Sequence, residues 1–380
     1  MKNFLILTNA DMSVQAGNVV LINRRAEEFY RKYNVRTTCI VMRKLERPIT
    51  HKTTGIDYKI ESSKVEIEKF IKSNKPSSIV FYGSRTYKFI SEIKRVLKTH
   101  NISSEILIDL QGALEELTDF SIGIEFLKNN LKLFVKRKSL SNALNSADGA
   151  FVVSDEMKKY CISFLDENII NKFKFYKVRC GINEIFKTQE KISWRNEVRK
   201  KWGIKEDTTV MVFSGYRMPW QKVNETIEIF QEYDKKTDNL LFVFYCNTDE
   251  NFEALLRDKF PKKNYVVEFL SFENYFKHLV ACDVGFLIRD YNTTNLVAFP
   301  NKFSDYMNAG LMIATNSAVP ETYNILMESG IDFIDINNTI DKSYELARNR
   351  QKNLKTFYKK SELVCENELL YSKQISNIIS

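Results

Sequence analysis

The stretch TVMVFSGYRMPWQKVNETIEIF (209–230) decides the fold. Its first six residues form an apolar run rich in β-branched and aromatic residues, which predicts a buried strand that ends before Gly215. A polar loop follows, and Val223, Ile227 and Phe230 then recur at the spacing of one helical face. The stretch therefore predicts a strand, a loop and an amphipathic helix in succession, which is the repeating unit of a parallel sheet.

The same unit recurs on both sides of this stretch. Short apolar runs that end in polar or glycine residues lie at 4–9, 37–42, 78–83, 105–112, 151–154, 175–181, 239–247, 264–270, 282–288 and 311–316. Helix-like segments separate them. This alternation indicates parallel sheets covered on both faces, so we expect an α/β protein with two doubly wound, Rossmann-like domains.

The length of the chain supports two domains. Its 380 residues exceed the roughly 250–300 residues at which a single core stops growing. The stretch 187–208 is polar and highly charged, which predicts a linker with a short helix. We place the domain boundary near residue 190, with a first domain over 1–190 and a second over 191–355.

The composition is that of an ordinary globular protein, with 44% hydrophobic and 28% charged residues. The N-terminal MKNFLILTNADMS carries an apolar run too short for a signal peptide. No apolar run approaches the roughly 18–20 residues needed to span a bilayer. We therefore expect a cytoplasmic protein.

Cysteine and histidine give no sign of a metal site. The six cysteines stand singly, mostly in apolar segments, and the three histidines lie far apart. Without a C-x-x-C pair or a ligand-like spacing, we expect neither zinc nor a disulfide framework, and no metal cofactor.

The net charge of +9 is concentrated in the first half. Residues 1–190 hold 32 Lys and Arg against 22 Asp and Glu, whereas the remainder holds 25 against 26. A basic half is typical of proteins that meet nucleic acid, an anionic membrane surface or a polyanionic substrate.

Ligands of doubly wound sheets bind at the carboxyl ends of the strands. After the strand at 209–214, a loop with Arg217 and Lys222 precedes a helix, an arrangement that suits a diphosphate. Loop cations also occur simply as solvated charges, and that interpretation is equally open.

A second candidate is LIRDYNTTNLVAFPNKFSDYMNAG (287–310). Arg289 follows a strand, Pro300 fits the turn before a helix, and Lys302 and Asp305 share a face of its first turn. An acid there suits the helix dipole, but a lysine near the positive end of a helix is unfavourable unless an anion lies close. An anion-binding site explains it.

The segment PNKFSDYMNAGLMIATN (300–316) resembles the P-x-K-F-x-E-Y signature of retaining glycosyltransferases of family 4, which have the GT-B fold and build bacterial surface polysaccharides. Further segments resemble the family in the same order. They are IDLQGALEE (108–116), SADGAFVVSDEMKKY (146–160), CGINEIF (180–186), SGYRMPWQKVNETIEIF (214–230) and ACDVGFLIRDYNTTNLVAFP (281–300).

The resemblance implies two Rossmann-like domains facing a central cleft. The first domain would bind the acceptor, a glycan or lipid-linked glycan, and the second the nucleotide-sugar donor. A C-terminal helix over 356–380 would cross back to the first domain. The implied activity is that of a hexosyltransferase that retains the anomeric configuration, in cell-surface polysaccharide biosynthesis.

Site residues follow from the resemblance position by position. The implied catalytic residues are Arg217, Lys222, Lys302 and Asp305, with the cations on the diphosphate and Asp305 on the ribose hydroxyls. The implied donor-binding residues are Gly215, Arg289, Asn292, Asn295, Pro300, Phe303 and Tyr306. On the acceptor side they are Gly17, Asp109, Gln111, Glu115 and Glu116.

Three positions depart from the family pattern. Asp305 stands where the family has Glu, and Val297 stands where the family has another Glu eight residues earlier. Gln111 replaces a His or Arg of many relatives. In the family, the first Glu contacts the donor sugar. No residue of this sequence is therefore assigned to that contact.

The sequence contains no Asp-x-Asp, the motif that binds a metal-diphosphate in the other large glycosyltransferase fold. We therefore expect metal-independent chemistry, in which cations and helix N-termini meet the charge of the leaving group. In the retaining family the departing phosphate is thought to take the proton of the acceptor hydroxyl.

The basic first half contains FLKNNLKLFVKRKSL (126–140), with Leu127, Leu131 and Phe134 on one helical stripe beside five Lys and Arg. Such a helix is typical of a surface for anionic lipids, on the inner face of a membrane, but packing into the core is an open alternative. The basic and aromatic alternation of 171–180 fits an edge strand guarded by lysines, and we expect no nucleic-acid partner.

Two alternatives to a glycosyltransferase remain at this stage. One is a catalytically silent relative that binds a glycan or a partner, because the two acids are altered. The other is a nucleotide-sugar epimerase, although the cleft motifs lack the extra carboxylates and histidine that such chemistry needs.

Overall fold

The structure is a computed structural model that describes residues 3–14, 16–49, 53–60, 62–338 and 343–379. The chain divides into two compact units. The first comprises Met1–Asn183, Val297–Phe299 and Tyr371–Ser380, and the second comprises Glu184–Leu296 and Pro300–Leu370.

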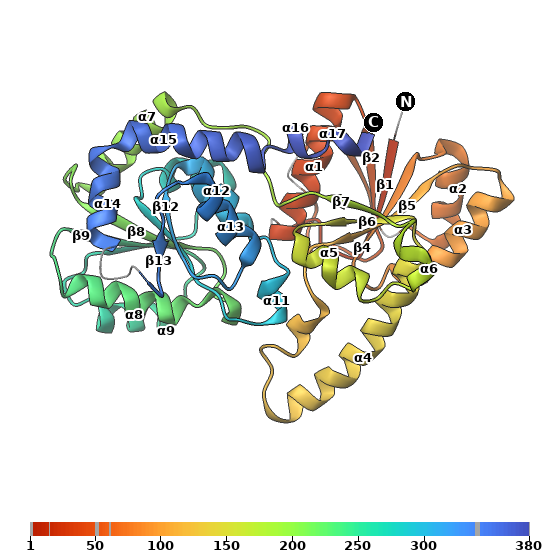
Figure 1. Cartoon of the computed structure of the whole chain (residues 1–380), viewed down its shortest axis with the longest axis horizontal. Coiled ribbons are helices and arrows are strands. Elements are labelled where there is room, and N and C mark those ends of the chain that lie inside the picture. The colour runs from red at the N-terminus through yellow and green to blue at the C-terminus, as the bar shows by residue number, and fades with distance from the viewer. Residues whose placement is uncertain (1–2, 15, 50–52, 61, 339–342, 380) are drawn as a thin grey trace. The chain divides into compact units, whose positions relative to one another are not determined.

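The first unit contains a seven-stranded sheet in the order β3-β2-β1-β4-β5-β6-β7, with every neighbouring pair parallel (Figure 1). Its strands are β1 (Asn3–Thr8), β2 (Arg36–Val41), β3 (Ile56–Ile60), β4 (Ser78–Tyr82), β5 (Glu105–Leu110), β6 (Gly149–Val152) and β7 (Lys174–Lys177). Its helices are α1 (Gly17–Tyr33), α2 (Lys64–Asn74), α3 (Ile90–Thr99), α4 (Gly123–Asn145), α5 (Asp155–Ile162), α6 (Glu167–Ile170), α16 (Tyr371–Gln374) and α17 (Ser376–Ile379), with short 3-10 turns at Tyr87–Phe89 and Leu114–Leu117.

The second unit contains a six-stranded parallel sheet in the order β10-β9-β8-β11-β12-β13. Its strands are β8 (Thr209–Ser214), β9 (Leu240–Tyr245), β10 (Tyr265–Glu268), β11 (Val284–Leu287), β12 (Met312–Thr315) and β13 (Ile334–Asp335). Its helices are α7 (Thr188–Trp202), α8 (Val223–Asp234), α9 (Glu250–Lys259), α10 (Phe272–Leu279), α11 (Thr293–Leu296), α12 (Asn301–Ala309), α13 (Pro320–Ser329), α14 (Ser343–Lys352) and α15 (Leu354–Val364), with a 3-10 turn at Pro219–Gln221 and a π-helical turn at Cys365–Leu369.

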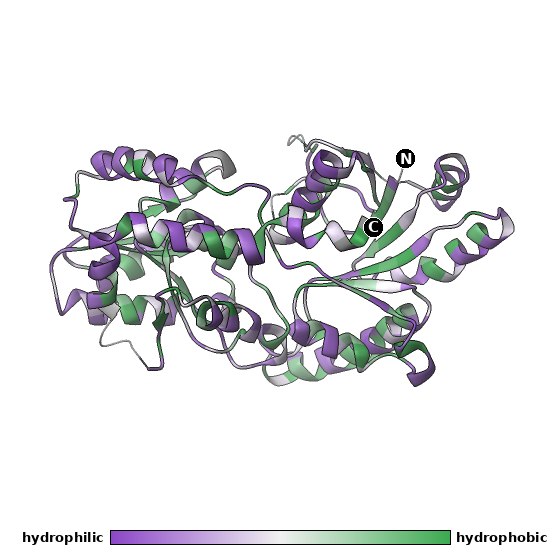
Figure 2. Ribbon diagram, turned by 45° about the horizontal axis from the view of Figure 1, so that its top comes forward, coloured by the Kyte–Doolittle hydropathy of each residue, from purple (hydrophilic) through white to green (hydrophobic). Residues whose placement is uncertain are grey.

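The central strands of both sheets are buried on both faces, as their continuous apolar runs predict. Every residue of β8 and of β9 is buried, so side chains that alternate between the faces are all covered. Figure 2 shows the same distribution, with hydrophobic residues on the strands and hydrophilic residues on the outer sides of the helices. The prediction of two Rossmann-like α/β domains is confirmed.

Local sequence signals set the helix ends. The Ser154 hydroxyl accepts a hydrogen bond from the Met157 N–H at 2.9 Å and starts α5, and the Asp249 carboxylate does the same for α9. Gly203 and Gly310 take the left-handed conformation just after α7 and α12, where a Cβ would be unfavourable.

The prediction of a linker with a short helix before β8 is wrong. The segment forms the 15-residue helix α7, which buries Lys191, Arg195 and Arg199 despite its charged sequence. Charged residues are almost never fully buried unless they are paired. All three are paired with carboxylates far along the chain: Lys191 with Glu362 at 3.5 Å, and both arginines with a single aspartate.

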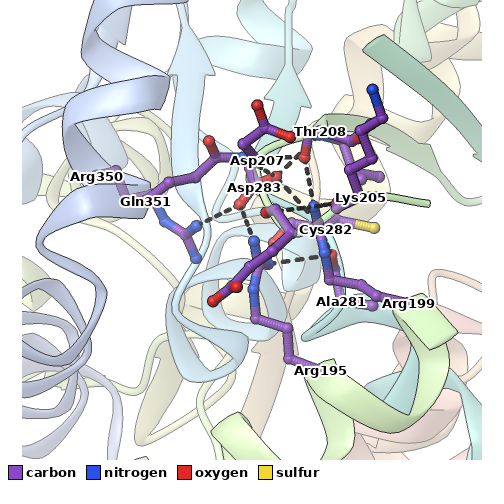
Figure 3. Close-up of polar contacts among 12 residues, drawn as sticks. Arg195, Arg199, Lys205, Asp207, Thr208, Ala281, Cys282, Asp283, Arg350 and Gln351 are labelled. Carbon is purple, nitrogen blue, oxygen red and sulfur yellow. Dashed lines mark hydrogen bonds and ion pairs between the residues drawn. The ribbon is translucent and has the colours of Figure 1, made fainter. Parts of the chain in front are cut away.

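That aspartate is Asp283, which three arginines surround (Figure 3). Arg195 and Arg350 donate to one oxygen at 2.6 and 2.8 Å, and Arg199 donates to the other at 3.3 Å. Burial alone would raise the pKa of Asp283, but the guanidiniums outweigh it and hold the pKa below its usual value. Arg350 Nε also donates to the Gly310 carbonyl at 3.1 Å, so the cluster ties the end of α12 to the start of β11.

Candidate functional site

The loop after β8 is built around Gly215. Its φ is +105°, and a Cβ there would lie 2.7 Å from the Cε of Lys302. The Gly215 N–H donates to the Tyr245 carbonyl at 2.8 Å, which holds the loop against β9. Glycine alone combines a readily populated positive φ with the absence of a Cβ. It therefore lets the Lys302 side chain approach the backbone at the carboxyl end of β8.

Lys302 lies in the first turn of α12 and is buried. Its Nζ donates to Gln221 Oε1 at 2.7 Å and lies 4.4 Å from the centre of the Phe213 ring. Burial and then the nearby Arg289 cation lower the pKa of Lys302 well below its usual value. The fold therefore holds the Lys302 amino group in surroundings that disfavour its charged form.

Arg289, just beyond β11, is buried beside it. Its Nη2 donates to the same Gln221 oxygen at 2.9 Å, and its Nη1 donates to the Ile288 carbonyl at 2.8 Å. Burial lowers the pKa of Arg289 to about 10. Two buried cations thus share one neutral amide oxygen.

Within the described part of the chain, neither Lys302 nor Arg289 forms an ion pair with a carboxylate. Buried charges in proteins are normally paired, because an isolated buried ion costs several kcal/mol. The pair lies at the carboxyl ends of β8 and β11 and at the first turn of α12, where parallel α/β sheets bind their ligands. Two buried cations without a carboxylate partner at this edge of the sheet form a candidate site for an anionic ligand.

The other two predicted cations are in different surroundings. Arg217 Nε donates to the Asn247 carbonyl at 2.8 Å, and its guanidinium pairs with Asp249. Lys222 forms ion pairs with Glu225 and, at 2.9 Å, with Asp290, and the bond to Glu225 is the main cause of its raised pKa. These two cations therefore already have carboxylate partners, unlike Lys302 and Arg289.

Of the remaining predicted residues, Pro300 lies just before α12, and Phe303, Asp305 and Tyr306 lie within it. Phe303 and Tyr306 are fully buried, and the Tyr306 hydroxyl lies 3.0 Å from Ser214 Oγ, which fixes α12 against β8. Pro300 precedes the first helical residue of α12, as expected. Asp305 is 9% exposed and lies three residues, about one helical turn, after Lys302.

Of the two predicted asparagines, Asn292 lies just before α11 and Asn295 lies within it. Asn292 Oδ1 accepts from the Asn295 N–H at 3.0 Å, and Asn295 Nδ2 donates to the Asp290 carbonyl at 3.0 Å. Both hydrogen bonds are local.

The predicted acceptor-side residues belong to the first unit. Gly17 is the first residue of α1. The Asp109 carboxylate accepts two hydrogen bonds of 3.1 Å from the buried Arg25 and one of 3.0 Å from Gln111. Asp109, Gln111 and α1 thus meet at the carboxyl end of β5, although Arg25 itself was not predicted from the sequence.

The two glutamates of the following turn differ. Glu115 is buried, and it accepts from Arg137 at 2.6 Å and from the Tyr160 hydroxyl at 2.7 Å. Glu116 is an exposed residue. The surrounding protein nevertheless desolvates its carboxylate and raises its pKa, and Lys136 opposes this shift. Glu115 is therefore a structural anchor, whereas Glu116 remains accessible.

Sequence reasoning missed Gln221, although it bridges the two buried cations. An uncharged residue between Trp220 and Lys222 carries no signal of its own. The only hint was its position in the loop after β8, and the sequence cannot show that its amide oxygen meets side chains 68 and 81 residues away.

The described residues hold neither a candidate metal site nor a candidate membrane span. No group of three or more His, Cys, Asp and Glu side chains is arranged to hold a metal ion. No helix in those same residues has the length and apolar character needed to cross a bilayer.

Solved structures share this fold over nearly the whole chain. WaaG, a glycosyltransferase involved in lipopolysaccharide biosynthesis, is 12% identical with a TM-score of 0.65, and 99% of each chain is covered. An α-glucosyltransferase in complex with UDP is 12% identical with a TM-score of 0.63, covering 100% of this chain and 98% of that one. The pneumococcal O-GlcNAc transferase GtfA, in complex with UDP and GlcNAc, is 9% identical with a TM-score of 0.61 and the same coverage.

At these identities the likeness shows the fold, which is GT-B. The chain matches no protein-family profile and no curated protein in sequence. The predicted fold class is thus confirmed by solved structures of glycosyltransferases.

Proposed function

We propose that the protein is a retaining, metal-independent glycosyltransferase. It moves a hexose from a nucleotide-sugar to a glycan or lipid-linked glycan in cell-surface polysaccharide biosynthesis, in the cytoplasm. The observation that carries the proposal is the buried pair of Lys302 and Arg289, two cations that share one amide oxygen and lack a carboxylate partner. The bound UDP of two structures with the same fold supports a nucleotide donor.

The pair fits the diphosphate of such a donor. Both cations are desolvated in the protein without ligand, so little water has to be removed from them when an anion binds. Breaking the sugar–phosphate bond increases the negative charge on the departing diphosphate. Lys302 and Arg289 would stabilise that charge in a site of low dielectric constant, where the attraction is strongest.

The neighbouring residues fit the rest of a nucleotide. Asp305 lies about one helical turn beyond Lys302 and would accept hydrogen bonds from the ribose hydroxyls. Tyr216 and Phe269, which follow β8 and β10, are exposed, with ring centres 6.4 Å apart. Exposed rings at this edge of the sheet would stack on the base.

Arg217 has a conditional role in this proposal. It pairs with Asp249, whose side chain is 55% exposed, so a phosphate would compete for the guanidinium against a solvated carboxylate.

Retention would follow if the acceptor hydroxyl attacks from the side on which the diphosphate leaves, with the phosphate taking the proton. In that mechanism no protein base is needed.

The test is a panel of UDP-, GDP- and TDP-hexoses in the presence of EDTA, with and without oligosaccharide acceptors. Release of nucleotide is measured, and the anomeric configuration of any product is read by NMR. We expect one donor to be cleaved, and Lys302→Met to slow its cleavage by more than about tenfold. Lys235→Met, which removes an exposed lysine paired with Glu232, serves as the matched control.

Two results separate the alternatives. Nucleotide binding without cleavage of any donor would indicate a catalytically silent relative. Conversion of the donor sugar without transfer or nucleotide release would indicate an epimerase.

A further inference from the structure

The exposed apolar residues of the protein gather on one helix. Seven of the 17 large hydrophobic residues that are exposed in the described chain lie between Ile122 and Val135, at the start of α4. Leu127, Leu131 and Phe134 are 66%, 74% and 72% exposed. The alternative that this stripe packs into the core is therefore wrong.

The helix has two apolar faces rather than one. Its inner face is buried against the first unit through Asn129, Leu133, Leu140, Ala143 and Leu144. At about 100° per residue, the opposite face spans an arc of about 100° and a length of about 16 Å. That face is formed by Ile124, Leu127, Leu131, Phe134 and Val135.

Burial against its own unit explains only the inner face. In Figure 1 the first half of α4 extends beyond the sheet of that unit. A contiguous exposed apolar surface of this kind is typical of a site that binds a membrane, another protein or a ligand. The outer face is called here the α4 stripe, after its five residues.

Charge identifies what the α4 stripe binds. The helix carries Lys128, Lys132, Lys136, Arg137 and Lys138 against one acid, Glu125. By helical position, Lys128 and Lys132 border the stripe on one side and Lys138 continues it. Lysines beside an apolar stripe let the stems lie along hydrocarbon while the ammonium groups reach anionic head groups.

A second copy of the chain fits less well. The 3-4 spacing of Ile124, Leu127, Leu131 and Phe134 would suit a short coiled-coil seam. Lys138 would occupy the next seam position, and the bordering lysines of two copies would repel each other. An anionic surface meets no such repulsion.

We propose that the α4 stripe binds the surface of an anionic lipid bilayer, with its five apolar side chains among the acyl chains and the bordering lysines against the head groups. The helix lies in the plane of the surface and does not span it. The proposal is independent of the proposed catalytic function, because the α4 stripe shares no residue with the cation pair.

The test is co-sedimentation of the full chain with vesicles. One set is phosphatidylcholine alone, and the other is phosphatidylcholine mixed with phosphatidylglycerol. We expect binding to the mixed vesicles that weakens as salt is added, and much weaker binding to phosphatidylcholine. Leu131→Asp with Phe134→Asp should reduce binding about tenfold or more, because it places two charges on the inserted face.

A matched control separates this face from exposed apolar residues in general. Val65→Asp with Leu363→Asp introduces the same change at side chains that are 60% and 57% exposed, and it should leave binding unchanged. Should the α4 variant fail to fold by circular dichroism, Lys128→Glu with Lys132→Glu tests the same surface and should lower binding to the mixed vesicles alone.

Three outcomes would overturn the proposal. The wild type does not bind mixed vesicles; the α4 variants bind them as well as the wild type; or the wild type associates with itself without lipid and the α4 variants abolish that association. The last outcome would assign the stripe to a protein interface.

Discussion

Lys302→Met should keep or raise the stability of the protein without ligand and weaken its binding of nucleotide. Lys302 Nζ and Arg289 Nη2 lie 2.7 and 2.9 Å from one oxygen, so they are at most about 5.6 Å apart. At an effective dielectric constant of about 20, their repulsion at that distance is about 3 kcal/mol. Methionine removes this repulsion and the burial of a charge, while Gln221 Oε1 keeps its bond to Arg289.

The substitution also removes a hydrogen bond of a charged group, which contributes about 1.5–3 kcal/mol. We therefore expect the free energy of unfolding without ligand to stay level or rise by about 1–2 kcal/mol. A phosphate at about 4 Å from a cation gains about 4 kcal/mol at the same dielectric constant, so the Kd of a nucleoside diphosphate should rise by about 100-fold or more.

The assay is urea denaturation of wild type, Lys302→Met and the control Lys235→Met, with and without a nucleoside diphosphate. A ligand at about 100 times its Kd stabilises the wild type by about 2.7 kcal/mol, and a 100-fold weaker Kd leaves only about 0.4 kcal/mol of that. The reasoning is refuted if Lys302→Met lowers the stability without ligand by several kcal/mol and keeps the full stabilisation by nucleotide.

Three further predictions concern pH and the scaffold. Because the folded-state pKa of Lys302 lies below its unfolded value, the unfolded chain binds more protons between the two, so stability without ligand should rise with pH through the lowered pKa and level off near the ordinary lysine value of 10.5; urea titrations in Lys302→Met should lack this rise. Asp283→Asn should destabilise the second unit by about 3–5 kcal/mol, because it leaves three buried guanidiniums without their carboxylate, as thermal melts would show and unchanged melting would contradict. Gly215→Ala should cost about 1–3 kcal/mol for its φ of +105° and weaken nucleotide binding by displacing Lys302, and calorimetry that shows wild-type affinity would disprove this link.

Most of the strands that the sequence predicted are buried on both faces, although the predicted β7 and β10 are partly exposed. β8 and β9 read as continuous apolar runs because each side chain meets a covered face. β3 escaped prediction because its residues beyond Ile56 are partly or largely exposed, and β13 because it has two residues. A strand that is half exposed or very short leaves no apolar run to find.

Buried charges were the main source of error. The sequence of α7 indicated a solvated linker because Asp283, which pairs with Arg195 and Arg199, lies more than 80 residues further on. The same limit applied to the site. Lys302 and Arg289 were found from the resemblance and from helix position, but the carboxylate that pairs with Arg217 and the oxygen of Gln221 become neighbours only in the folded chain.

The most direct test of the cation pair is a calorimetric titration of the full chain with UDP, GDP and TDP in EDTA. Binding of at least one of them to the wild type, with an affinity about 100-fold lower in Lys302→Met, is the predicted result. Equal affinity in both proteins, or no binding of any nucleoside diphosphate to the wild type, would contradict the assignment of Lys302 and Arg289 to a diphosphate.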